Sequence, residues 1–401
     1  MKSRLMGITL FALTASAILL APMRHSTGAV PSPVIGQTLQ TAHARGAAAI
    51  EVVFVLDTTG SMSGLIEAAK EKIWSIASSM AQADSAPQIR MGLVAYRDRG
   101  DVYVTRVTDL SSDLDSVYAT LMDYRAGGGG DAPESVNKAL YDALHGISWS
   151  RDQGTYRVIF LVGDAPPHMD YPDEPGYPQI IASARAHGIV VNAIQAGSSH
   201  ATGQEWRRIA SLGAGEFFQV DPTGSAVAIT TPYDDRLAAL SKELDATRLY
   251  YGDSETRAQK EGKLAATRKL HESASVASRA RRATFNASES GEANLLGENE
   301  LVDDVSRGRV DLDAIDRRDL PEPLQGLAPA AARDMLEEVA EKREQLRDEI
   351  GQLAQQRRDF LTKRVEEEGG AEASLDARIF GAVRKQAAAK GLKYDAAAPA
   401  Y

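Results

Sequence analysis

The sequence predicts an α/β fold in which a doubly wound, mostly parallel sheet precedes an α-helical C-terminal extension. Between residue 50 and about residue 250, apolar runs of strand length alternate with segments of helical spacing. Strands that are apolar almost throughout are typical of a parallel sheet whose two faces are both covered by helices. Residues 330–368 then carry apolar side chains at intervals of three and four among many charges, which predicts one long helix.

The predicted elements of the sheet domain follow one another in a regular order. The continuous apolar runs predict inner strands, whereas the alternating stretch 102–107 predicts a short edge strand. In such a fold, ligands bind at the carboxyl ends of the strands, near a topological switch point. The predicted inner strands are residues 50–56, 89–96, 156–162, 189–194 and 217–220, and the predicted helices are residues 66–80, 114–124, 133–147, 180–187 and 206–212.

The first 29 residues have the pattern of a secretory signal peptide. Lys2 and Arg4 give a basic start, no residue from Leu5 to Met23 is charged, and residues 27–29 offer a small-residue cleavage site. We therefore expect an extracytoplasmic protein, periplasmic or secreted, with residues 30–49 as a linker. The alternative is that residues 5–23 remain as an anchor, and only then do we expect contact with a membrane.

Composition excludes several classes of function. The formal net charge is −10, whereas binding to a nucleic-acid backbone needs a surplus of lysine and arginine on one face. The sequence contains no cysteine, which excludes disulfides, catalytic thiols and thiolate zinc sites. We expect no nucleic-acid partner, and we expect the exported protein to be held together by its core or by a hard metal ion.

The character of the chain changes beyond the sheet domain, which we expect to occupy residues 50–250. Residues 251–327 are polar and interrupted by prolines, which predicts an irregular connector, and residues 328–401 predict a helical extension. The long helix has a narrow apolar seam with arginines on it, and two alternatives stay open: a hairpin that folds back on this chain, or an intermolecular coiled coil. The seam consists of Leu336, Val339, Leu346, Ile350, Leu353 and Phe360, with Arg343 and Arg357 on the same line.

Three polar clusters lie where the predicted sheet brings strand ends together. Residues 57–61 follow the first strand, residues 127–134 precede a helix, and residues 163–168 follow the strand that ends at Val162. Spacing of two along an extended loop puts Asp57, Thr59 and Ser61 on one side of the chain. Apart from one histidine, the donors are oxygens, which a hard cation such as magnesium prefers. The sequence therefore predicts a divalent-cation site at this edge.

The first of these clusters resembles a known family. Residues 57–62, Asp-Thr-Thr-Gly-Ser-Met, resemble the D-x-S/T-x-S signature of von Willebrand factor type A domains, and Asp164 is similar to the later aspartate of their metal-ion-dependent adhesion site. The resemblance covers about residues 50–250 and implies a Rossmann-like fold. It also implies Mg²⁺, or another divalent cation such as Mn²⁺ or Ca²⁺, on the hydroxyls of Thr59 and Ser61, with Asp57 and Asp164 acting directly or through water. One coordination position is then left for an acidic group of a protein partner.

The middle cluster departs from the pattern of the adhesive members, which usually supply a threonine there. Here the glycine run ends in Asp131, which either starts a helix, with Pro133 and Glu134 in its first turn, or serves as a third carboxylate around the ion. If Asp131 is a ligand, its charge weakens the capture of a partner's carboxylate. The runs 129–134 and 164–168 are similar to those of a bacterial, largely uncharacterised branch of the family.

The clusters supply an ion and hydroxyls without an evident base or activated nucleophile, which favours a non-catalytic, cation-dependent protein-binding module. One alternative is a magnesium-dependent phosphatase resembling the haloacid dehalogenases, with Asp57 as nucleophile and Asp164 and Asp170 on the metal. Against it, Thr59 stands where those phosphatases use an acid. A second alternative is a scaffold protein that acts through its C-terminal helix.

Overall fold

The computed structural model describes residues 49–130, 132–220, 229–367 and 375–394, which fall within one compact unit. The predicted signal peptide, Asp131 and all of the predicted linker except Ala49 lie outside the described residues. The strands are β1 (Ala49–Asp57), β2 (Gln88–Tyr96), β3 (Thr105–Ser111), β4 (Tyr156–Gly163), β5 (Ile189–Ala196) and β6 (Ala214–Val220). Among the described residues, no helix is long and apolar enough to cross a membrane.

The six strands form one sheet in the order β3-β2-β1-β4-β5-β6, in which only β3 runs antiparallel to its neighbour. The predicted doubly wound, mostly parallel sheet is confirmed. The edge strand β3 begins three residues later than expected. Its pairing with β2 starts opposite Thr105, because the preceding loop turns toward the glycine-rich segment, where Asp101 accepts hydrogen bonds from the Gly129 amide.

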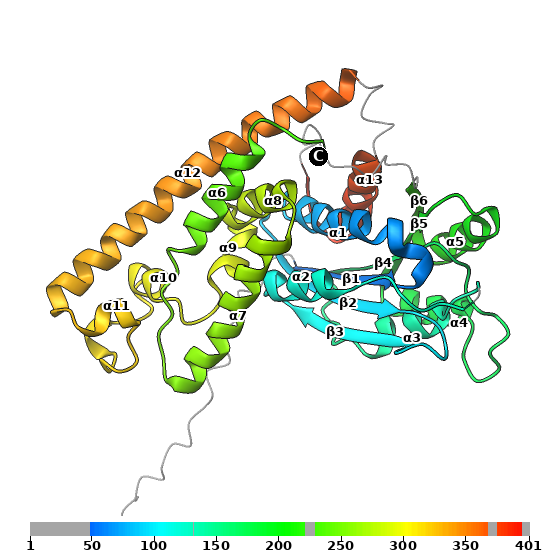
Figure 1. Ribbon diagram of the computed structural model, residues 1–401, viewed down its shortest axis with the longest axis horizontal. Helices are drawn as coiled ribbons and strands as arrows, with labels where there is room; N and C mark the ends of the chain where they lie inside the picture. The colour runs from blue at the N-terminus through cyan, green and yellow to red at the C-terminus, as the bar shows by residue number, and fades with distance from the viewer. Residues whose placement is uncertain (1–48, 131, 221–228, 368–374, 395–401) are drawn as a thin grey trace, which may run out of the picture. The chain divides into compact units, whose positions relative to one another are not determined.

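Helices cover both faces of the sheet, as Figure 1 shows. One face carries α1 (Ile66–Met80) and α2 (Leu114–Asp123), and the other carries α3 (Val136–His145), α4 (Tyr177–Ala186) and α5 (His200–Leu212). The position of β1 between two hydrophobic cores explains why its sequence is apolar at nearly every position. Its residues 50, 52, 54 and 56 belong to the core under α1, whereas residues 53 and 55 belong to the core under α3.

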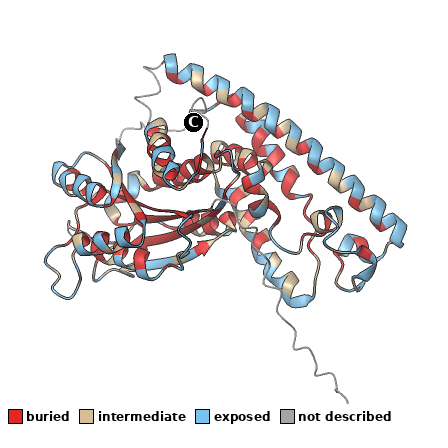
Figure 2. Ribbon diagram, turned by 180° about the vertical axis from the view of Figure 1, so that it is seen from behind, coloured by how far each residue is buried: buried red, intermediate tan, exposed pale blue. Residues whose placement is uncertain are grey.

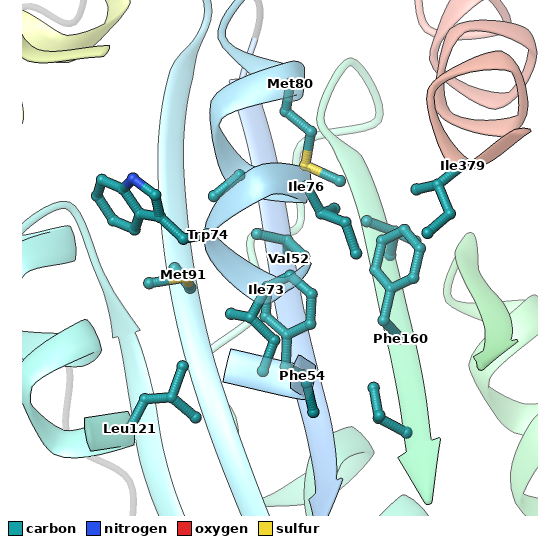
Figure 3. Packing of buried hydrophobic residues seen from close by; sticks show 14 of the residues in the cluster. Val52, Phe54, Ile73, Trp74, Ile76, Met80, Met91, Leu121, Phe160 and Ile379 are labelled. Carbon is teal, nitrogen blue, oxygen red and sulfur yellow. The ribbon is translucent and has the colours of Figure 1, made fainter. Parts of the chain in front are cut away.

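The core under α1 is packed around two aromatic rings from neighbouring strands. Phe54 of β1 and Phe160 of β4 stack with ring centroids 5.5 Å apart, and Ile73 and Ile76 of α1 lie over them (Figure 3). All four side chains are almost fully buried. This packing stabilises the register of β1 and β4, so that the two strands end beside each other.

Adjacent β1 and β4 mark the switch point of the fold. From β1 the chain moves to β2 on one side, and it later returns to β4 on the other side. Since both strands run in the same direction, Asp57 and Gly163 end them at the same edge of the sheet, which is where doubly wound folds bind their ligands.

The prediction of an irregular connector over residues 251–327 is wrong. The segment contains α7 (Ser254–Ser273), α8 (Val276–Ala287), α9 (Glu289–Leu296), α10 (Leu301–Ser306) and the single turn α11 (Glu322–Gln325), and it follows α6 (Asp234–Asp245). Its helices pack partly through buried polar groups, so its apolar pattern is weak. Arg282 of α8, for example, donates to the carboxylates of Asp115 in α2 and Asp245 in α6.

The predicted long helix is α12 (Pro329–Glu367), which packs against α6, α8 and α10 of the same chain. Its outward side is largely exposed (Figure 2). The two arginines on the seam each meet a buried carboxylate: Arg343 contacts Glu300, and Arg357 contacts Asp234. The described part of the seam therefore follows the fold-back alternative, and an intermolecular coiled coil stays a prediction.

The last described helix, α13 (Leu375–Ala388), returns to the sheet domain rather than extending away from it. It packs against α1 and β6, with Ile379 and Val383 buried in the core of that face. Lys72 of α1 donates to Asp376, and Gln386 exchanges hydrogen bonds with Asn192 of β5. The C-terminal region thus contributes a helix to the domain that carries the candidate site.

Candidate functional site

The candidate site begins at the last residue of β1. The Asp57 side chain is fully buried, and its Oδ1 atom accepts hydrogen bonds from the Thr59 amide at 2.8 Å and from Thr59 Oγ1 at 2.7 Å. A short 3₁₀ turn, η1 (Gly60–Gly64), follows and presents Ser61 at the surface, with its Oγ atom 3.1 Å from Thr59 Oγ1. Alternate residues of this loop therefore bring one carboxylate and two hydroxyls together.

Asp164 joins this group from the end of β4. Ser61 Oγ donates to Asp164 Oδ1 at 3.0 Å, so a continuous series of contacts runs from Asp57 through Thr59 and Ser61 to Asp164. The backbone of this second loop is held from the other side, since Thr202 Oγ1 of α5 donates to the Asp164 carbonyl. The structure thus brings together four of the five residues that the sequence predicts as ligands.

The glycine-rich segment closes the site from a third side. The Gly127 amide donates to the Thr58 carbonyl, and the Gly60 amide donates to the Gly128 carbonyl. Gly128 and Gly129 have φ angles of +76° and +75°, which favour glycine. A Cβ atom on Gly129 would lie 3.2 Å from the Thr59 Cβ, so the segment passes close over the hydroxyls.

Glu134, not included among the predicted ligands, is the carboxylate that the described part of the middle loop brings to the site. The expectation that it lies in the first turn of a helix is wrong, because α3 begins only at Val136. The Glu134 amide donates to the Pro166 carbonyl and its carbonyl accepts from the His168 amide, which ties this residue to the loop after β4. Its side chain is 2% exposed, and Glu134 lines the same hollow as Ser61 and Asp164.

The electrostatics of the site follow from burying several carboxylates near one another. Burial raises the pKa of Asp57 to about 7, and the charge of Asp164 acts in the same direction, against the hydrogen bonds from Thr59. Burial also raises the pKa of Glu134 to about 9, together with the charges of Asp57, Asp98, Asp101 and Asp164. Burial likewise raises the pKa of Asp164. In each case, a nearby positive charge would favour the ionised form.

The residues present fit a hard divalent cation. Asp57 Oδ2 and Glu134 Oε2 are buried and have no hydrogen-bond partner. The side chains of Ser61, Glu134 and Asp164 line an open hollow of about 390 Å³. In the described part of the chain, no three carboxylate or imidazole side chains converge in metal-binding geometry. The donors that converge are two carboxylates and two hydroxyls, with Glu134 as an additional charge beside them.

His168 is buried beside Glu134, and its ring nitrogens lie near the carboxylates of Asp170 and Asp98. Its Nδ1 lies 2.7 Å from Asp170 Oδ1, and its ring stacks on Tyr171, whose hydroxyl donates to Asp98. Asp98 also accepts from Ser135 Oγ at 2.7 Å. This network holds the loop after β4 against the start of α3, and so it positions Glu134.

Comparison with known proteins agrees with this geometry. A doubly wound sheet with an aspartate, two hydroxyls and a second aspartate at its switch point defines a class of Rossmann-like domains with a metal-ion-dependent adhesion site. Residues 51–225 match the sequence profile of the von Willebrand factor A domain, and this part of the chain is a von Willebrand factor A domain. Such domains commonly mediate protein–protein interactions with a divalent metal at that site.

The chain spans less than half the length of each of three relatives that it matches. The alpha-protein kinase vwkA of Dictyostelium discoideum is 31% identical over 126 residues, which are 31% of this chain and 20% of the kinase. A solved structure of proximal thread matrix protein 1 from the mussel byssus, with a zinc-occupied MIDAS motif, is 16% identical and covers 44% of this chain and 43% of its own, with a TM-score of 0.36. A von Willebrand factor type A structure from Catenulispora acidiphila is 19% identical over 44% of this chain and 40% of its own, with a TM-score of 0.34.

Proposed function

We propose that this protein is an exported, non-catalytic module that binds a protein partner in the presence of a divalent cation, Mg²⁺ in the first place. Asp57, Thr59, Ser61 and Asp164 would hold the ion, directly or through water, and the ion would supply a coordination position for the partner. The bacterial branch of the family and the extracytoplasmic location are part of this proposal, and they rest on the sequence motifs and on the N-terminal signal pattern.

One observation carries the proposal. Two carboxylates and two hydroxyls from separate loops are linked to one another by contacts of 2.7 to 3.1 Å, and the outer oxygen of Asp57 is buried without a partner. Burial of an unsatisfied carboxylate oxygen is unfavourable unless a donor or a cation meets it. A purely structural turn would need no such arrangement, whereas a cation would satisfy that oxygen and pair with both carboxylates.

Glu134 sets the chemistry of the partner in this proposal. If the bound cation keeps Asp57, Asp164 and Glu134 ionised, three negative charges surround an ion that carries two positive ones. The loaded site is then less electrophilic than one that has a threonine in the middle loop. An acidic group of the partner would therefore bind weakly, and its affinity would depend strongly on neighbouring contacts. The same argument holds for Asp131, which lies outside the described residues, and its role as a ligand stays a prediction.

A capture experiment tests the proposed function. The full chain is immobilised and exposed to extracellular or periplasmic extract of the host, with 5 to 10 mM Mg²⁺ in one arm and a chelator in the other; these concentrations are rough choices well above the affinity of a weak site. Asp57→Ala is run beside Asp152→Ala, which removes an aspartate remote from the site. A partner that the wild type and Asp152→Ala retain only with Mg²⁺, and that Asp57→Ala does not retain, supports the proposal. Retention that is unchanged by chelator contradicts it, and phosphatase turnover abolished by Asp57→Asn would favour the phosphatase alternative.

A further inference from the structure

A second polar cavity lies far from the candidate cation site, between α1, α8 and α12. These three helices are far apart in the sequence, and α8 contacts both of the others (Figure 1). The cavity measures about 170 Å³, several times the roughly 30 Å³ that one water occupies in the liquid. It is lined by Ser78, Ala81, Gln82, Arg281, Thr284, Phe285, Ser288, Ala354, Arg357 and Arg358. Three of these residues are arginines and none is acidic.

Arg281 of α8 has buried hydrogen-bond donors that a ligand could satisfy. It is 8% exposed, and its Nε and Nη1 atoms are buried without a hydrogen-bond partner. The nearest carboxylate, Glu71, lies 3.5 Å from Nη1 and already accepts a hydrogen bond from Ser278 Oγ at 2.6 Å. On the opposite wall, the Ser78 hydroxyl is also buried without a partner. Two helices thus each contribute to the cavity lining a residue with a buried donor that has no hydrogen-bond partner.

Among the described residues, three arginines and no carboxylate line the cavity. Arg357 donates to Asp234 at 2.7 Å, and burial lowers the pKa of Arg357, with the nearby charge of Arg281 acting in the same direction. Two guanidinium groups thus repel each other in a buried place, while the partly exposed Arg358 adds a third charge at the rim. Glu71 contacts Arg281 and Asp234 contacts Arg357, but neither acidic residue lines the cavity.

Helix capping does not account for this arrangement. The cavity lies near the C-terminal ends of α1 and α8, where carbonyl groups attract arginine side chains. However, the unsatisfied nitrogens of Arg281 donate to none of those carbonyls. Guanidinium groups form paired hydrogen bonds with phosphate-like oxyanions, and buried charges persist where a counter-ion meets them.

We propose that this cavity is an anion site that takes a tetrahedral oxyanion, either free phosphate or the phosphate group of a small metabolite. The guanidinium of Arg281 and the hydroxyl of Ser78 would bind the oxygens, with Arg358 closing the open side. Because the site joins α1 of the von Willebrand factor A domain to α8 and α12, bound phosphate would hold the C-terminal helices against that domain. The proposal does not depend on the proposed function of the cation site.

The test is a titration of the full chain with inorganic phosphate, followed by isothermal calorimetry and by thermal unfolding at constant ionic strength. Sodium chloride is the control for screening, and sodium acetate tests whether a planar carboxylate suffices. Glycerol phosphate, a phosphate monoester, distinguishes the two sources of phosphate. A site that takes the phosphate group of a metabolite binds it as well as free phosphate, whereas a site with a closed rim binds the free ion alone. The expected result is a melting temperature that rises with phosphate and not with chloride at the same ionic strength.

Two variants decide whether the arginines are responsible. Arg281→Met should melt no lower than the wild type without phosphate, because it removes a buried charge, and its phosphate affinity should fall at least tenfold. Arg358→Gln, at the rim, should lose affinity without a change in stability, and Arg384→Gln, at an exposed position of α13, is the matched control. An unchanged phosphate affinity in Arg281→Met, or no phosphate binding by the wild type, would overturn the proposal. Preferential binding of acetate would identify a carboxylate site instead.

Discussion

Ser61 Oγ donates a hydrogen bond of 3.0 Å to Asp164 Oδ1, although 103 positions separate these residues in the sequence. The bond joins the loop after β1 to the loop after β4 at the switch point of the sheet. Ser61→Ala should therefore weaken Mn²⁺ or Mg²⁺ binding on the order of 10- to 100-fold, by removing both an oxygen donor and the link to Asp164. Calorimetry measures this change, and Ser63→Ala, at an exposed position two residues on, is the control expected to bind as the wild type does.

Gly163 has room for no side chain. A Cβ atom there would lie 2.4 Å from the hydroxyl oxygen of Tyr96 and 2.8 Å from the Cβ of Asp57. We expect Gly163→Ala to lower the free energy of unfolding by about 1–3 kcal/mol and to shift Asp57 away from Thr59, with weaker cation binding as a result. Denaturant unfolding measures the first effect. Gly64→Ala meets no atom within 4 Å and should leave stability nearly unchanged, so equal losses in both variants would refute the argument.

Glu134 separates cation binding from stability. Burial, and to a smaller extent the negative charges nearby, raise the pKa of its carboxyl to about 9. Glu134→Gln should stabilise the protein in chelator by roughly 1 kcal/mol, because the buried Glu134 carboxyl must take up a proton on folding whereas an amide does not, and it should reduce cation affinity about tenfold. Thermal unfolding with chelator and with Mg²⁺ shows both effects. A variant that binds the cation as tightly as the wild type would exclude Glu134 from the site.

Asp57, Thr59 and Ser61 could be predicted from the sequence because they stand at every second position of one short loop and so form a local pattern. Asp164 could be added because the order of strands alone places its loop at the same edge. Glu134 could not be found in this way, since Pro133 and a following apolar pattern are equally typical of a helix start. Only the pairing of its backbone with Pro166 and His168 reveals that the residue lies outside α3. The proline-bounded acid before α3 is the signal that could have suggested it.

The C-terminal helices were harder to predict for a different reason. Periodicity detects helices through apolar stripes, whereas α7 and α8 bury many polar groups, among them Lys263, Thr267 and Arg282. The long helix α12 was predictable because its seam is mostly apolar, and even its two seam arginines meet carboxylates supplied by other helices. Long-range pairing of this kind leaves no periodic trace in the sequence.

The cluster of Arg282 with Asp115 and Asp245 should dominate the acid sensitivity of the fold. Burial raises the pKa values of both carboxyls, but the Arg282 charge outweighs it and holds them below their usual range. Their folded-state pKa values are depressed, so the stability they contribute is present above the unfolded value near 4 and is lost as the pH falls through the folded values. We expect Arg282→Ala to cost about 3–5 kcal/mol at neutral pH, because it leaves two buried carboxylates without their shared partner.

Unfolding by denaturant at pH 7 and at mildly acidic pH measures this effect. The loss caused by Arg282→Ala should shrink as the carboxyls become protonated. Arg236→Ala, which removes a half-exposed arginine paired with Glu349 at the surface, is the control and should cost no more than about 1 kcal/mol at either pH. A loss in Arg282→Ala that does not depend on pH would contradict the electrostatic explanation.

Helix α13 should behave as part of the sheet domain. Ile379 is 2% exposed and lies in the same core as α1 and β4. We expect Ile379→Ala to cost about 2–5 kcal/mol and to unfold in one transition with the rest of the domain, whereas the exposed Arg384→Ala should change stability by less than about 0.5 kcal/mol. A small loss for Ile379→Ala, measured by denaturant unfolding, would show that α13 is not docked in solution.

A magnesium titration that follows thermal unfolding tests the central claim most directly. At a hundredfold excess of Mg²⁺ over its dissociation constant, the wild type should gain about 2.7 kcal/mol of stability, which corresponds to a rise of several degrees in the melting temperature. Asp57→Ala should show no such rise, and Asp152→Ala should respond as the wild type does. No shift in the wild type up to tens of millimolar Mg²⁺, Mn²⁺ or Ca²⁺, or an equal shift in Asp57→Ala, would contradict a cation site at the ends of β1 and β4.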